Sequence, residues 1–65
     1  MAFDFVVQRL QIGDVILLGE TEATVTRDIV RTDGTVRVTL RPEGSAEDIV
    51  EEWPVDTMVT VVRGP

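Results

Sequence analysis

Carboxylates and guanidinium groups are the charged side chains through which this 65-residue chain could act as an acid or base or hold a charged ligand. The chain has no Cys and no His, so the usual zinc and iron ligands and the commonest general base are missing. Adjacent carboxylates such as Glu51 and Glu52 would point to opposite faces of a strand, and the ligand spacing of a calcium-binding EF-hand is absent. Ser45 and the threonines belong to no motif that pairs a nucleophile with a base. We therefore expect a non-enzymatic protein that uses no metal and no cofactor.

The acidic residues are concentrated in one segment of a chain whose formal net charge is −6. Segment 43–56 contains no Arg and holds Glu43, Glu47, Asp48, Glu51, Glu52 and Asp56. Such a band could dock a basic protein or imitate a nucleic-acid backbone. We favour a third interpretation, in which the charges protect an edge strand, because like charges at an edge discourage pairing between sheets.

The arginines are also grouped, because segment 27–41 contains Arg27, Arg31, Arg37 and Arg41. If all four face outward, they could form a basic stripe that contacts phosphates. A solvated face with partners such as Asp28 and Thr39 is the favoured interpretation, because the net negative charge repels polyanions. Nucleic-acid binding is therefore the alternative function, and a protein partner is the leading one.

The aromatic residues are too few for a methyl-lysine cage or a groove for proline-rich peptides, each of which needs several rings. They are Phe3, Phe5 and Trp53. Trp53 could anchor a partner, since Trp is enriched at interface hot spots, but the favoured interpretation places it at the rim of the core. Phe3 and Phe5 could cover one end of the fold or contact a second subunit.

Strand signals dominate the elements that would position these residues. The apolar run 15–18 predicts a buried strand, and 23–31 and 58–63 are rich in β-branched residues. Segment 35–41 alternates apolar and polar residues with period two. Between the two longest runs stands Asp33-Gly34, which predicts a hairpin with a type I′ turn.

That two-residue turn fixes the register of the hairpin. It places Ile29 opposite Val38 and Arg31 opposite Val36. Arg27 would then lie opposite Leu40 on the core side. A bulge near Arg27 would release its side chain outward, and bulges are common where a strand bends.

Two segments leave alternatives open. Residues 45–53 could form a short helix capped by Ser45, or a strand in which Ile49, Glu51 and Trp53 alternate. We favour the strand, because an isolated eight-residue helix is marginal. Residues 1–9 show no clear period and fit a strand, a helical turn or an apolar arm. Tight turns are expected at 41–44, as type I with Pro42 in the second position, and at 54–57.

The chain resembles an SH3-like small β-barrel over residues 10–63. The opening Leu10-Gln11-Ile12-Gly13-Asp14-Val15-Ile16 is similar to that of the KOW and Tudor-like branches. Segments 23–26 and 59–63 also resemble small proteins of actinobacteria and their phages. The resemblance implies an all-β, five-stranded barrel at 10–65 with an N-terminal arm at 1–9.

The resemblance also implies a binding function, because these branches bind nucleic acid, modified lysine or arginine, proline-rich peptides or other proteins. We expect a protein-interaction module, with self-association as a homodimer left open. No apolar run is long enough to cross a membrane, and the first residues do not form a secretory signal, so a cytoplasmic location is expected.

Overall fold

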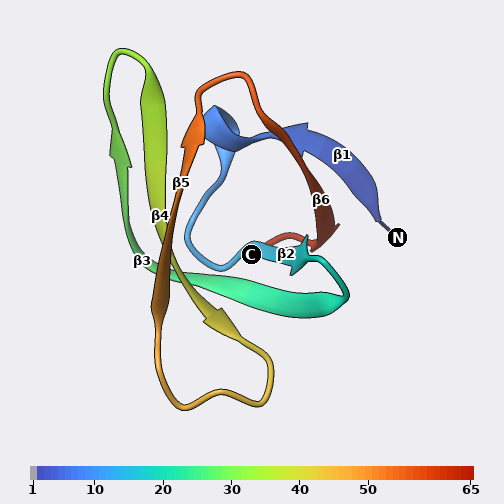
Figure 1. The fold of residues 1–65 in the computed structure, drawn as a ribbon. Helices are drawn as coiled ribbons and strands as arrows, with labels where there is room; N and C mark the ends of the chain where they lie inside the picture. The colour runs from blue at the N-terminus through green and yellow to red at the C-terminus, as the bar shows by residue number, and fades with distance from the viewer. Residues whose placement is uncertain (1) are drawn as a thin grey trace.

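A single antiparallel sheet accounts for nearly all of the computed structural model, which describes residues 2–65 (Figure 1). Its strands are β1 (Phe3–Val6), β2 (Val15–Leu18), β3 (Thr21–Arg31), β4 (Thr35–Pro42), β5 (Ile49–Pro54) and β6 (Met58–Arg63), and a 3₁₀ turn, η1 (Val7–Arg9), follows β1. The order across the sheet is β1-β6-β2-β3-β4-β5. The chain is therefore all-β, as expected. The sheet has six strands where five were predicted, and it is not closed, since β1 and β5 are its two edges.

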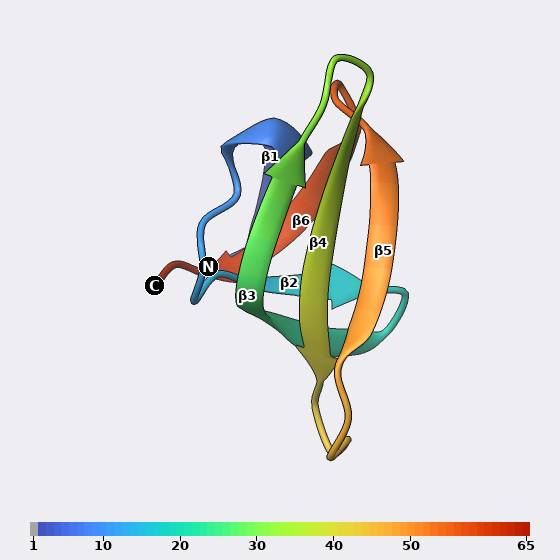
Figure 2. The ribbon, with the colours of Figure 1, turned by 90° about the vertical axis from the view of Figure 1, so that its left-hand side faces the viewer.

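The long strand β3 bends sharply and gives the sheet two layers. Its pairing with β4 shifts register on both sides of Arg27, so that Arg27 lies opposite Thr39 and Val25 opposite Leu40. A bulge near Arg27 is thus confirmed, and its side chain is exposed. Figure 2 shows β3, β4 and β5 side by side, with β2 and β6 crossing behind them. A bulge adds unpaired residues to one strand only, which bends that strand.

The hairpin between β3 and β4 has the predicted register beyond the bend. Ile29 lies opposite Val38, and Arg31 lies opposite Val36. The type I′ turn is wrong, however, because neither Asp33 nor Gly34 has a positive φ. The hydroxyl of Thr32 accepts a hydrogen bond from the amide of Thr35 at 3.2 Å, and the amide of Thr32 donates to the carbonyl of Thr35 at 2.9 Å. These local bonds close the loop without a left-handed residue.

The second hairpin connects β4 to β5 through residues 43–48. Ile49–Pro54 is a strand, so the favoured alternative for this segment is confirmed. The preceding turn lies one residue later than predicted, because the amide of Ser45 donates to the carbonyl of Pro42 at 3.0 Å. Gly44 then occupies the third position with φ 83°, as a type II turn requires. Pairing continues past Pro42, since the amide of Glu43 donates to the carbonyl of Glu22 at 2.8 Å.

A tight corner before β2 fixes the start of the sheet. The buried carboxylate of Asp14 accepts the amide of Gln11 at 2.8 Å. The amide of Gly13 donates to the carbonyl of Val25, and the amide of Val25 donates to the carbonyl of Asp14, each at 2.8 Å. The Gly-Asp turn is thus attached directly to β3.

The N-terminal segment belongs to the sheet. Residues 3–6, which fall within the expected arm, pair with β6, with Phe3 opposite Val61 and Phe5 opposite Val59. Met1 lies outside the described residues.

Arg31 holds residues 8–10 against the end of β3. Its Nε and Nη2 donate to the carbonyls of Gln8 and Leu10 at 2.8 and 2.9 Å.

Between the two layers lies one apolar core. It draws side chains from η1, from the segment after it and from four strands: Val7, Leu10, Ile16, Ala23, Val25, Val36, Val38, Leu40 and Val61. Phe5 and Trp53 pack against its rim and are half-buried. Within residues 2–65, no helix is long and apolar enough to span a membrane.

The two turn glycines make separate predictions. Gly44→Ala is expected to lower the free energy of unfolding by about 1 kcal/mol, because φ 83° is unfavourable for any residue with a Cβ. Gly34→Ala is expected to leave it unchanged or raise it by up to about 1 kcal/mol, since Gly34 has no positive φ and open space surrounds its Cβ position. Urea unfolding of both variants measures the difference. If Gly34→Ala lowers the free energy of unfolding as much as Gly44→Ala does, Gly34 has a positive φ and the turn is type I′ after all.

Candidate functional site

A charge cluster forms where the two hairpins meet. Asp48 accepts from Nε of Arg41 at 2.8 Å and lies 3.4 Å from Nε of Arg27. The hydroxyl of Thr26 also reaches its carboxylate, at 3.4 Å. The Asp48 side chain is only 15% exposed, whereas both guanidinium groups remain largely open to solvent. One carboxylate therefore joins β3, β4 and the loop before β5.

Local structure explains why these three residues meet. The register shifts around Arg27 turn its side chain to the outer face of the sheet. The pairing of Leu40 with Ile49 places Asp48 immediately beyond β5 and beside Arg41. Of the partners expected from sequence, Thr39 does lie opposite Arg27 across the hairpin, whereas the ion-pair partner of Arg27 is Asp48 and not Asp28. Asp48 was not predicted as a partner from the sequence, although the register of the second hairpin would have placed it beside Arg41.

The four hairpin arginines do not form one basic stripe. Arg27 and Arg41 share Asp48, and Arg31 is committed to backbone carbonyls on the other side of the sheet. Arg37 is exposed on the outer face, opposite Val30 on β3 and Glu52 on β5. The guanidinium charges are thus distributed over separate places, and two of them share one carboxylate.

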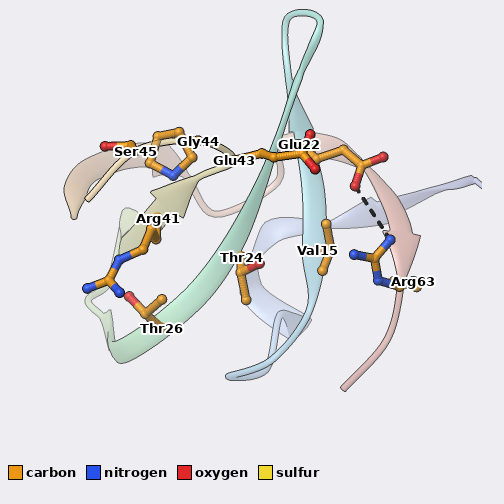
Figure 3. A pocket seen from close by; sticks show the side chains of 10 residues that line it. Val15, Glu22, Thr24, Thr26, Arg41, Glu43, Gly44, Ser45 and Arg63 are labelled. Atoms are coloured by element: carbon orange, nitrogen blue, oxygen red, sulfur yellow. Dashed lines mark hydrogen bonds and ion pairs between the residues drawn. The ribbon is translucent and has the colours of Figure 1, made fainter. Parts of the chain in front are cut away.

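An open pocket of about 390 Å³ lies on the outer surface near the bend of β3 (Figure 3). Arg41 and Arg63 stand at opposite ends of it, with Thr24 and Val15 between them. Nη1 of Arg63 is 3.4 Å from a carboxylate oxygen of Glu22. Arg41, at the other end, is paired with Asp48. Both guanidinium groups at the pocket are therefore ion-paired, although Arg41 shares its acid with Arg27.

Two of the hydroxyl groups around this pocket, those of Thr26 and Ser45, are engaged in local bonds. Thr26 donates towards Asp48 or the carbonyl of Thr39, and Ser45 donates to the carbonyl of Glu47. Across the described part of the chain, no group of three or more carboxylates is arranged to hold a metal ion.

The edge strand β5 combines exposed apolar and acidic side chains. Val50 is 59% exposed and Ile49 is 36% exposed. Glu52 is exposed on the outer face, and Glu51 lies opposite the core residue Val38 and so faces the inner side. Within residues 2–65, neither carboxylate has an Arg within ion-pair distance. Trp53, opposite the buried Val36, is half-buried on the same inner side.

The other edge strand, β1, carries the two phenylalanines. Phe3 is 49% exposed, and its ring meets Phe5 edge to face, with centroids 5.8 Å apart and an interplanar angle of 86°. Phe5 packs against the core, so Phe3 continues the apolar interior to the free edge. The structure therefore places the aromatic candidates at opposite edges of the sheet, with Trp53 on β5 and the phenylalanines on β1.

Comparisons of this chain with protein-family models, with curated proteins and with solved structures give no match.

The shared carboxylate yields a stability prediction. Asp48→Asn is expected to lower the free energy of unfolding by about 1–2 kcal/mol, because a charged acceptor of two guanidinium groups and a hydroxyl is lost. Glu47→Gln removes the same charge from an exposed neighbour and is expected to change it by less than about 0.5 kcal/mol. Equal effects in urea unfolding would mean that only net charge matters.

Proposed function

We propose that this chain is a non-enzymatic protein-interaction module that binds an extended, basic segment of another protein along β5. The observation that carries this proposal is the free edge of β5, where two glutamates that are not ion-paired within residues 2–65 lie beside exposed apolar residues. One of them, Glu52, accepts a hydrogen bond from the hydroxyl of Thr35 at 3.2 Å. In strand addition, main-chain hydrogen bonds supply affinity and alternate side chains supply specificity.

Both faces of β5 offer the same combination of contacts to an added strand. On the outer face, Val50 is followed by Glu52, and on the inner face Ile49 is followed by Glu51. A partner strand with apolar and basic residues on each face would bury the valine and isoleucine side chains and neutralise the carboxylates. Glu47 and Asp56, both exposed, extend the negative charge beyond the ends of the strand.

The same acids reject the wrong partners. A second copy of this chain would bring its own acidic β5 against the first, and like charges directly opposite one another destabilise a pair of strands. The edge protection expected from sequence and the proposed binding are therefore one property. Acids at an edge repel most strands and select basic ones.

At a finer level, we propose that the chain is a variant of the SH3-like small barrel. Support comes from the opening residues 10–16 and from β6, which returns to pair with β2 after the chain has passed through β3, β4 and β5. The alternative function, nucleic-acid association through the hairpin arginines, has less support, because Arg27 and Arg41 are both ion-paired with Asp48, and Arg31 binds carbonyls.

The test uses an extended peptide of roughly ten residues that repeats two Val followed by two Arg, so that each face of the strand carries both residue types, and a companion with Glu in place of Arg. The Arg peptide is expected to bind and to slow amide exchange at residues 49–53, and the Glu peptide is expected not to bind. Affinity should fall as salt rises from about 0.01 to 0.15 M, since the Debye length shortens from about 30 to 8 Å. No binding of the Arg peptide at low salt would overturn the proposal.

A matched pair of variants locates the interaction. Glu52→Arg is expected to weaken binding of the Arg peptide by about tenfold, which corresponds to about 1.4 kcal/mol. Glu20→Arg makes the same change of charge in the exposed turn between β2 and β3 and is expected to weaken it much less. Equal losses would place the attraction in the net charge of the molecule and not on β5.

A further inference from the structure

The free edge of β1 differs from that of β5 in both charge and side-chain character. Asp4 is the only ionised side chain within β1, whereas β5 carries adjacent glutamates. Phe3 at this edge is half-exposed, and Met58, opposite Val6 on the outer face, is 57% exposed. An unpaired strand with apolar side chains is a template for another strand. A strand that covers this edge must therefore present apolar side chains.

We propose that β1 pairs with β1 of a second copy of this chain, in an antiparallel arrangement that continues the sheet across a two-fold axis. A two-fold axis perpendicular to a sheet sets an edge strand antiparallel to itself, which is the geometry of every strand pair in this fold. The interface is isologous, and each copy contributes the same residues to it.

Symmetry restricts the register of this pairing. In an antiparallel pair, residues directly opposite each other point to the same face of the sheet. Because side chains alternate between faces along the strand, the residue at the two-fold axis must lie opposite its own copy. An axis at Asp4 would oppose two carboxylates, which is unfavourable. An axis at Phe5 sets Phe5 against the Phe5 of the second copy and sets Asp4 against Val6. Of these two registers, the one at Phe5 avoids the contact between carboxylates.

This register extends the core of each copy. Phe3 and Phe5 lie opposite Val61 and Val59, so their rings are on the core side of β1. Across the axis, Phe5 of one copy would meet Phe5 of the other, and each half-exposed Phe3 ring would lie diagonally across from the second copy's Phe5 and lose water contact. A chain of this length buries only about 60% of the surface its unfolded form exposes, so additional apolar burial matters.

Salt separates this contact from the one proposed for β5. Two copies with the same net charge repel each other, and salt screens that repulsion. The β1 dimer is therefore expected to strengthen as salt rises, while binding of a basic strand at β5 weakens. The two proposals can fail independently, because they use opposite edges of the sheet.

Sedimentation over a roughly hundredfold range of protein concentration tests the dimer. The wild type is expected to pass from monomer to dimer, and Phe3→Ser is expected to raise the dissociation constant at least tenfold, about 1.4 kcal/mol. Ile12→Ser is the matched control, because Ile12 is 57% exposed but lies outside every strand. A wild type that stays monomeric at all concentrations and salts, or an equal effect of the Ile12 variant, would overturn the proposal.

Disulfide trapping tests the register and does not depend on the Phe3 variant. The chain has no Cys, so a single introduced thiol reports one position. In an oxidised equimolar mixture of the Asp4→Cys and Val6→Cys chains, the mixed dimer is expected to exceed both same-chain dimers, since these positions face each other across the Phe5 axis. Predominant Asp4→Cys self-dimers, or no crosslinks in any combination, would contradict the proposed pairing.

Discussion

The bend of β3 at Arg27 is the constraint on which this fold depends. Without the register shifts on both sides of that residue, β3 and β4 would form a flat ribbon with one apolar face in water. With them, the two halves of β3 belong to different layers, and Val25 and Val38 meet in one core. The same irregularity turns Arg27 outward, where it reaches Asp48. Folding of the sheet and placement of the charge cluster thus have one cause.

Sequence patterns predicted the parts of the fold that depend on neighbouring residues. The alternation of 35–41 and the two-residue loop determined the pairing of Ile29 with Val38, and the alternation of Ile49, Glu51 and Trp53 indicated β5. The predicted type I′ turn was wrong, because the hydroxyl of Thr32 accepts the amide of Thr35 and the loop closes without a positive φ. The meeting of Asp48 with Arg27 could not be predicted locally, since it requires the registers of two hairpins together. The same is true of β1, whose partner β6 lies at the other end of the chain.

An open sheet must deal with two edges, and this chain treats them differently. The acids of β5 lie at one end of the strand order, and the phenylalanines of β1 lie at the other. Glu51 faces the inner side of its edge strand, an arrangement that opposes unspecific pairing at some cost to burial. The acidic segment 43–56 of the sequence therefore makes the β5 edge of the sheet more negative than the β1 edge. The arginines contribute little to this difference, because Arg27, Arg41 and Arg63 are already paired with acids.

The size of the chain connects these edges to stability. No disulfide can support a core built from valine, leucine and isoleucine side chains in a chain of 65 residues, because the sequence has no Cys. Any strand that pairs with β1 or β5 binds the folded state and not the unfolded one, so it raises the free energy of unfolding by mass action. Exposed apolar side chains at the two edges, such as Phe3 and Ile49, then have a role in binding. In both proposals they are the places where a partner would complete the core, and for this reason the free edges connect the fold to the proposed function.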